Sequence, residues 1–547
     1  MGNLEGFKMN LLMPALAFLA LGLWLMIPVC LFAVALFSAR SGDVLKLNHC
    51  WRVASQLLRA SMVLTIVIAA LLMAEKALTG SSDSLTGAAH RLGLYTDGVA
   101  LWMALMVAFI GWAILRFAEN YLRGDPGRDR FLPWFLTTVT CVMVLAFTNN
   151  LLVLAGAWVG VSLALHNLLT LYPDRPQARI AAVQKFIVSR VGDALVIGGV
   201  LLLYHHYGSF RLPDMVAMQA ANPGDSAALN TAAILLALAA VLKCAQIPFH
   251  GWLLRVMEAP TPVSALLHAG VINLGGFLWL RLFPVFEGFT AGHMILLVVG
   301  GTTAVIAVIT MMTHYSVKHA LAWSTCAQMG FMLFEIGMGA YTLALLHLLA
   351  HSVYKAHSFL AAGRTVSVSA VDVFPESTAG NRLFWAGSTA ALASAMLLWQ
   401  PWLVEGNPVF GALLVLAVAS AAMGMPRGTR LAARMRIAGL ALLLVPVYAI
   451  LHALLGSAVP EHATFALPGV ALGIGFGLLA ALVLLSLMVA LAPRARPVAS
   501  LHRHFSQGLY LDLPFDQLTR RLASQALNAP AALNRAPHRP FTVEEKA

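Results

Sequence analysis

Long apolar segments recur along the whole chain and alternate with short polar loops. A helix that crosses a bilayer needs about 20 mostly apolar residues, and by that rule the chain has about fifteen spans. The predicted spans are 9–38, 57–75, 97–118, 131–147, 149–168, 183–205, 229–254, 262–283, 292–313, 318–339, 341–363, 383–400, 408–425, 435–456 and 468–492. The pattern predicts an all-α polytopic membrane protein with about 15 transmembrane helices. The first run is too long for a signal-peptide core, so we interpret it as a retained span.

The composition excludes several classes of soluble protein. Of the 547 residues, 60% are hydrophobic and only 11% are charged, whereas soluble domains average about 25% charged residues. The net charge of +12 is scattered through short loops, which argues against nucleic-acid binding. The five cysteines form no CxxC pair, and there is no GxGxxG motif and no phosphate-binding P-loop motif. We therefore expect no metal and no other cofactor in this chain.

Lysine and arginine residues concentrate in the loops that follow the odd-numbered spans. Those loops contain Arg40, Lys46, Arg52, Arg123, Arg128, Arg130, Arg175, Arg179, Arg255, Lys318, Arg364, Arg382, Arg427, Arg430 and Arg434. The other side has only Lys8, Lys76, Arg91, Arg211 and Arg281. Cytoplasmic loops carry the cationic excess, here about threefold. We expect the N-terminus outside and the C-terminus in the cytoplasm, in a cell inner membrane.

The segment Leu242–Leu282 places ionisable residues inside an apolar region. Lys243 is followed by Pro248 and His250, and His268 lies near the start of the next span. A proline removes a backbone hydrogen bond, which is tolerated at membrane depth only where protein or a water-filled cavity satisfies the freed group. Ionisable side chains at that depth mark ion pathways by default. The segment therefore predicts an ion-path element beside a broken helix.

Lys243, with His250 and His268, is the first candidate group. A buried lysine with adjustable neighbours can alternate between charged and neutral states, as a proton relay requires. The alternative is a lysine that extends to the membrane surface. Lys243 lies about fifteen residues into its span, too far from either interface for that, so we favour the relay.

A second group lies at the start of the sixth span and contains Lys185, Arg190 and Asp193. Arg190 and Asp193 are three residues apart and therefore share one helix face. Two interpretations stay open. The pair is either an intrahelical ion pair near the interface or a charge that tunes a neighbouring lysine.

A third group is the series His347, His351 and Lys355, whose spacing of four residues puts all three on one helix face. Imidazoles titrate near neutral pH and can pass protons through water. A metal site and ordinary core histidines are the competing interpretations. Glu335 and His166 are lone polar groups in their spans, and we rank them lower.

The order of several motifs resembles the proton-conducting membrane transporter family, which includes the antiporter-like subunits of complex I and of Mrp sodium/proton antiporters. The resemblance covers roughly residues 95–365. It rests on TDGVALWM, ENYLRGDPGRDRF, KFIVSRVGDA, the Lys243 segment, and HYSVKHALAWSTCAQMGFM through HLLAHSVYKAHSFLAAG. It implies two inverted five-helix repeats, each with a broken helix. By position, Lys243 corresponds to the central lysine of the first repeat, and His347, His351 and Lys355 to the path toward the second.

The resemblance also implies a division of the chain. We expect N-terminal transmembrane helices over 1–95, a first antiporter-like repeat over 96–256, and a second repeat with the C-terminal helices over 257–492. Residues 493–547 form a cytoplasmic segment, in which Leu501–Leu527 predicts an amphipathic helix or a short helical hairpin. The remainder, rich in proline, alanine and charge, predicts a disordered tail. The segment is either a solvated tail or a docking site for a partner.

Two departures from the family pattern matter. The fifth span usually carries a glutamate that pairs with the lysine, and Val159 occupies its position. The second broken helix usually carries a charge, but the stretch 407–425 has none. The second half-channel is therefore expected to be disabled or rerouted, with Asp193 or an external group replacing the glutamate.

With these two departures, the chain resembles the membrane subunit of DAB-type inorganic-carbon transporters. The resemblance implies a proton-translocating membrane subunit, surrounded by lipid, which drives a large cytoplasmic DabA-like zinc protein that resembles a carbonic anhydrase. The zinc would then lie in the partner. The alternatives are an antiporter-like subunit of a complex I-type NADH-quinone oxidoreductase or multisubunit Na+/H+ antiporter, and a non-conducting scaffold.

Overall fold

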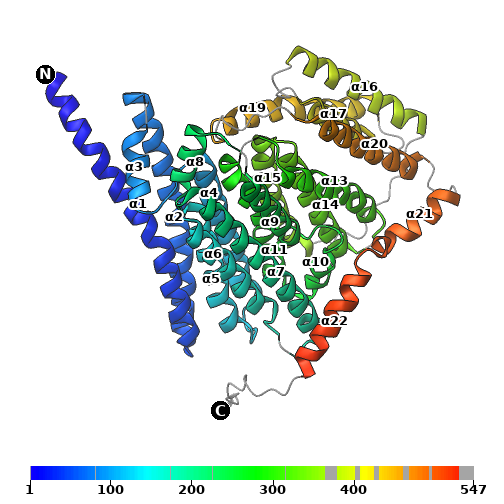
Figure 1. Ribbon diagram of the computed structural model, residues 1–547. Helices are drawn as coiled ribbons and strands as arrows, with labels where there is room; N and C mark the ends of the chain where they lie inside the picture. Colours follow the sequence, from blue (N-terminus) through cyan, green and yellow to red (C-terminus); the bar gives the residue numbers. More distant parts are fainter. Residues whose placement is uncertain are drawn as a thin grey trace.

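The computed structural model describes residues 2–80, 82–172, 174–224, 226–286, 288–314, 316–363, 379–400, 407–423, 430–459, 467–491 and 496–528 (Figure 1). Its first half contains α1 (Gly2–Arg40), α2 (Val44–Thr79), α3 (Asp83–Arg91), α4 (Gly98–Tyr121), α5 (Arg128–Phe147), α6 (Leu151–Leu169), α7 (Pro176–Tyr207), α8 (Leu212–Ala221), α9 (Ala227–Lys243) and α10 (Gly251–Arg255). In these residues, extended structure is limited to two isolated bridges. The predicted all-α class is confirmed.

The second half continues as helices to the end of the described chain. It contains η1 (Val256–Glu258), α11 (Thr261–Ala269), η2 (Val271–Asn273), α12 (Leu274–Leu282), η3 (Phe283–Val285), α13 (Ala291–Met311), α14 (Val317–Gly337), α15 (Tyr341–Leu360), α16 (Ala379–Trp399), α17 (Pro408–Met423), α18 (Leu431–Leu442), α19 (Leu444–Gly456), α20 (Gly469–Leu491), α21 (Arg496–Ser506), η7 (Gly508–Tyr510) and α22 (Leu513–Asn528).

Each predicted span coincides with helical structure. Within the described residues, ten helices or helical segments are long and apolar enough to cross a bilayer. The other five predicted spans coincide with α9, α14, α15, α16 and α17. Of these, α9 and α17 are apolar but shorter, with 17 and 16 residues, and α14 and α15 carry the ionisable groups described below. The protein is therefore a multi-pass membrane protein.

The helices form one large bundle with a smaller group beside it. A single apolar core extends through α1–α15, and smaller apolar clusters join α16, α17, α18 and α19. In Figure 1 the smaller group lies along one end of the bundle, next to α13 and α15. The candidate ion-path residues all belong to the large bundle.

Two breaks interrupt the helical segment that carries the candidate residues. The first follows Lys243, where Ala245 adopts a positive φ of 50° and the chain turns before α10 begins. The second lies at Gly270, between α11 and η2. The described part of the charge-free stretch is a continuous helix, α17, whose buried residues include Val409 and Val418. Residues 424 and 425 of that stretch lie outside the described residues.

Small residues allow the helices around these breaks to approach closely. A Cβ added at Gly275 of α12 would lie 2.9 Å from the carbonyl oxygen of Ala240 in α9, so the two breaks are packed together. Similarly, a Cβ at Gly330 of α14 would lie 2.6 Å from the carbonyl oxygen of Gly300 in α13. Close packing through small residues is the usual basis of helix association in membranes.

The C-terminal arm, residues 496–528, contains α21, η7 and α22. The two helices run one after the other along the side of the bundle, so they do not form a hairpin (Figure 1). Arg255 of α10 forms ion pairs with Asp512 and Asp516 of the arm, and Gln184 of α7 donates to Asp516 at 2.7 Å. The predicted tail beyond residue 528 lies outside the described residues.

Candidate ion path inside the bundle

Lys243 is the last residue of α9, which gives its ammonium a favourable position. The unpaired carbonyl groups at a helix C-terminus carry partial negative charge and favour a cation there. The ammonium donates to the hydroxyl of Ser162 at 3.3 Å and lies 4.3 Å from the centre of the Trp158 ring. Such a ring face attracts a cation. The break after Lys243 therefore places a partly accessible lysine against α6, inside the bundle.

A second lysine reaches the same point of α6. Lys185 of α7 is 3% exposed and donates to the carbonyl oxygen of Ser162 at 2.9 Å. Ser162 thus joins the two lysines, one through its side chain and one through its backbone. Like charges repel strongly in a medium of low dielectric constant, so a charge on one lysine disfavours a charge on the other. The pair is suited to sharing a proton.

Asp193 supplies the carboxylate of this cluster. Its Oδ2 lies 2.6 Å from Nη2 of Arg190 on the same helix, and its side chain is 6% exposed. Asp193, Lys185 and Lys243 line one cavity of about 20 Å³, which is room for about one water molecule. The Arg190–Asp193 ion pair therefore lies beside both lysines, where its charge can act on them.

Helix α6 contacts Lys243 through Trp158 and Ser162 rather than through Val159, which stands where the family usually has a glutamate. Trp158 and Ser162, one helical turn apart, line the cavity, whereas Val159 does not. A hydroxyl and an aromatic face hold the ammonium without adding a negative charge. Asp193 is the carboxylate that lines the cavity.

A second cluster surrounds Lys355 of α15. This lysine is fully buried and donates to the carbonyl oxygen of Leu321 in α14 at 2.9 Å. His268 and His351 are also buried and lie within electrostatic range of Lys355. His268 contacts the hydroxyl of Thr325 through Nδ1 at 3.1 Å. The structure therefore places His268 with Lys355, although the sequence suggested grouping it with Lys243.

Glu335 extends this cluster, although sequence reasoning ranked it low. Its Oε2 lies 2.9 Å from Nδ1 of His347, and Nε2 of the same ring lies 2.7 Å from Oε1 of Gln328. The ring can therefore donate to an acceptor on each side when it is protonated. The sequence signal that could have identified this pair is a carboxylate in one predicted span and a histidine in the next span. In the described residues no group of three or more His, Cys, Asp or Glu side chains is arranged to hold a metal ion.

Helix α11 separates the two clusters. Leu267 lines the cavity beside Lys243, whereas the next residue, His268, stacks on Phe359 of α15 at 4.5 Å between ring centres. The second break lies directly beyond α11, and Asn273 there donates to Ser352 of α15 at 2.7 Å. Helix α11, which ends at the second break, therefore contacts both clusters.

His250 lies apart from both clusters. It is fully buried, its ring centre lies 4.9 Å from that of Trp323, and neither ring nitrogen has a hydrogen-bond partner within the described residues. Asp512 of the C-terminal arm and Arg255 lie within electrostatic range of its ring. His250 therefore belongs to the contact between the arm and the first break.

His166 and Arg281 are further buried polar groups in the bundle. His166 of α6 lies within electrostatic range of Lys185, so it borders the first cluster despite its low rank. Arg281, counted above as a loop cation, is buried in α12 and lies 2.9 Å from Oδ1 of Asp97 at the start of α4. That ion pair crosses 184 residues of sequence, so no local pattern could identify it.

Family models match most of this region. The description "NADH:quinone oxidoreductase/Mrp antiporter, TM" matches residues 148–373, and "NADH-Ubiquinone oxidoreductase (complex I), chain 5 N-terminus" matches residues 85–132. A solved Mrp complex from Dietzia sp. has a chain that is similar with a TM-score of 0.55 and 21% identity. That alignment covers 96% of this chain and 60% of the Mrp chain. It supports the fold alone.

Curated relatives give the more specific comparison. The chain is 42% identical to the probable inorganic carbon transporter subunit DabB of Hydrogenovibrio crunogenus, over 64% of this chain and 68% of the relative. It is also 42% identical to the probable subunit DabB2 of Halothiobacillus neapolitanus, over 50% of this chain but only 49% of that relative. The chain belongs to the family of antiporter-like membrane subunits that complex I, Mrp antiporters and the DabB subunits of inorganic carbon transporters share.

Proposed function

We propose that this chain is the proton-translocating membrane subunit of an energy-coupled inorganic-carbon transporter. The observation that carries the proposal is the meeting of Lys185 and Lys243 at Ser162, beside a helix break. Ionisable side chains are costly at membrane depth, so two lysines at one point indicate a task that an apolar core does not need. Similarity to the DabB subunits supplies the inorganic-carbon part of the proposal.

The proton enters the first cluster through a hydrated path and is held by Lys243 or Lys185, with Asp193 and Arg190 balancing the charge. It crosses at α11 to His268 and Lys355. His351 and His347 then carry it to Glu335. Imidazoles and lysines in contact with water can receive and release protons along such a path. Each step changes the charge of one group, and that change shifts the proton affinity of the ionisable groups beside it.

The flux drives a cytoplasmic partner that resembles a carbonic anhydrase and holds the zinc. The partner hydrates CO2 to bicarbonate and a proton, and the energy of inward proton movement through this chain drives that conversion in one direction. The protein lies in the cell inner membrane with its N-terminus outside. His250 and the C-terminal arm, at the first break, link the ion path to the cytoplasmic face where the partner binds.

Replacement of Lys243 by alanine tests the ion-path assignment. The readout is uptake of labelled inorganic carbon by cells that produce the chain with its partner, with and without a protonophore. The matched control is Lys318→Ala, because Lys318 is an exposed lysine at the start of α14. We expect Lys243→Ala to abolish the protonophore-sensitive uptake and Lys318→Ala to preserve it. A non-conducting scaffold would keep full uptake in both variants, which would overturn the proposal.

A second candidate function is an antiporter-like subunit of a complex I-type oxidoreductase or a multisubunit sodium/proton antiporter. The family models that match this chain favour it, because their descriptions name complex I and the Mrp antiporter. Purification from native membranes in mild detergent, followed by mass spectrometry, distinguishes the two. One large zinc-containing cytoplasmic protein supports inorganic-carbon transport. Flavin and iron–sulfur subunits, or several small antiporter subunits, would instead support the second candidate.

A further inference from the structure

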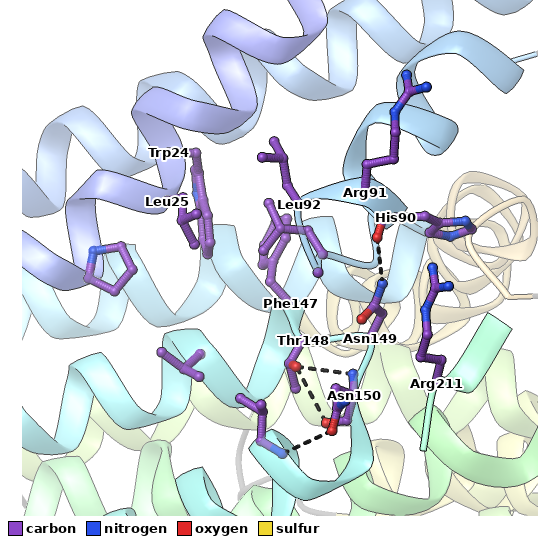
Figure 2. A pocket seen from close by; sticks show the side chains of 15 residues that line it. Trp24, Leu25, His90, Arg91, Leu92, Phe147, Thr148, Asn149, Asn150 and Arg211 are labelled. Carbon is purple, nitrogen blue, oxygen red and sulfur yellow. Dashed lines mark hydrogen bonds between the residues drawn. The ribbon is translucent and has the colours of Figure 1, made fainter. Parts of the chain in front are cut away.

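A pocket that shares no residue with either ion-path cluster is lined by residues beside α3 and α8, two helices that lie near one end of the bundle in Figure 1. It has a volume of about 620 Å³, which is in the range of small-molecule sites. Figure 2 shows side chains from α1, α3, the α5–α6 connection and the start of α8 around it. None of these residues takes part in the proposed ion path, so the pocket needs a separate explanation.

One wall of the pocket is apolar and continues onto the membrane-facing surface. Leu25 of α1 contributes to this wall, and behind it the buried rings of Trp24 and Phe147 stack on each other with 3.9 Å between their centres (Figure 2). Val153 of α6, another lining residue, is 46% exposed, and its neighbour Leu152 is 50% exposed. An apolar surface of this kind, on a helix that faces lipid, suits an acyl chain.

The opposite rim carries positive charge. Arg91 at the end of α3 and Arg211 before α8 both line the pocket and are both exposed. In the described residues Arg91 has no carboxylate partner, and its guanidinium lies 5.0 Å from the centre of the Phe18 ring. Arg211 has only a distant one, since its Nη1 lies 4.0 Å from Asp214. Both guanidinium groups keep donors available for an anion.

His90 and the asparagines give the rim a fixed shape. Burial, together with the charge of Arg211, lowers the pKa of His90, so its ring adds no positive charge at neutral pH. Its carbonyl oxygen accepts a hydrogen bond from Asn149 at 3.2 Å, and the backbone of Asn150 donates to Thr148 at 3.1 Å (Figure 2). These bonds hold the α5–α6 connection, so the rim does not need to be ordered by a ligand.

An apolar wall open to the membrane and a rim with two arginines match an amphiphile with a negative head group. We propose that this pocket binds an anionic phospholipid, with the head group at the rim that carries Arg91 and Arg211 and an acyl chain along Leu25 and Val153. Arg91 and Arg211 are two of the five cations that the sequence pattern assigns to this side of the membrane, and both line this pocket.

The experiment uses the full-length protein in nanodiscs that contain equal amounts of phosphatidylglycerol and phosphatidylcholine. After extraction into mild detergent, native mass spectrometry measures the ratio of the two lipids that stay bound. The test variant is the double substitution Arg91→Gln and Arg211→Gln, and the control is Arg123→Gln, an exposed arginine in a different loop. Each pocket arginine is expected to change retention about fivefold, which corresponds to about 1 kcal/mol.

We expect wild-type protein and the Arg123→Gln control to retain phosphatidylglycerol in preference, and the double variant to lose that preference. Excess inorganic phosphate should not displace the lipid. Equal retention of both lipids by wild type would overturn the proposal, and so would an unchanged preference in the double variant. Displacement by inorganic phosphate alone would also overturn it, because the site would then bind a free anion rather than a lipid.

Discussion

Lys243 and Lys185 share one partner, Ser162, which accepts from Lys243 through its hydroxyl and from Lys185 through its carbonyl oxygen. Only the first of these bonds depends on the serine side chain. A single substitution at Ser162 can therefore remove the hydrogen bond of Lys243 and leave the backbone contact of Lys185 in place.

Ser162→Ala should lower protonophore-sensitive uptake by about tenfold or more, because a hydrogen bond to a charged group contributes about 1.5–3 kcal/mol. Ser162→Thr keeps a hydroxyl and should restore most of the activity. The thermal midpoint of the purified protein serves as the folding control and should change little. Equal uptake by the alanine and threonine variants would mean that the hydroxyl has no part in the path.

Glu335 and His347 should act as a unit, because their side chains are 2.9 Å apart. Glu335→Gln and His347→Gln should each reduce uptake strongly, and the double variant should be no worse than either single one. Glu258→Gln, which removes an exposed carboxylate, is the matched control. Additive losses in the double variant would contradict a shared role.

The Arg281–Asp97 pair should be important for stability rather than for transport. The Arg281 side chain is 1% exposed, so Asp97→Asn leaves a buried charge without its partner, and such a change costs about 3–5 kcal/mol. We expect a clearly lower thermal midpoint in detergent. Glu119→Gln, which removes an exposed ion pair with Arg116, should cost about 1 kcal/mol or less. Similar midpoints for the two variants would contradict this interpretation.

The contact between α13 and α14 should tolerate no side chain at Gly330. A Cβ there would lie 2.6 Å from the carbonyl oxygen of Gly300, and overpacking of this kind costs about 1–3 kcal/mol. Gly330→Val should therefore lower the thermal midpoint. Gly439→Val in α18 is the control, because a Cβ at Gly439 meets nothing within 4 Å. The prediction is wrong if both substitutions have the same effect.

The C-terminal arm should detach when its acidic anchors are removed. Asp512 and Asp516 pair with Arg255 beside the first break, so the variant with Asp512→Asn and Asp516→Asn should show faster hydrogen exchange in α22. Asp129→Asn, an exposed carboxylate at the start of α5, is the control. Unchanged exchange in the double variant would mean that apolar contacts, such as Phe249 with Phe515, hold the arm by themselves.

The positions of the apolar helices and the helix break after Lys243 were predictable because they depend on local sequence, although only ten of the fifteen predicted spans are long and apolar enough, within the described residues, to cross a bilayer. A run of about 20 apolar residues specifies a spanning helix wherever it packs. The spacing of His351 and Lys355 likewise fixes a shared helix face. The same holds for Arg190 and Asp193, which are close for the purely local reason that they lie three residues apart on one helix.

The grouping of the candidate residues was decided only by the tertiary structure. His268 joined Lys355 rather than Lys243 because it lies on the side of α11 that faces α15. Glu335 gained His347 through the packing of two helices, and Lys185 met Lys243 through a serine that no pattern had singled out. Helix periodicity states which residues share a face, whereas the partner of that face depends on how distant helices pack. The sequence alone thus determined the apolar helices, the helix break and the list of ionisable groups, and the packing of the helices determined which of those groups meet.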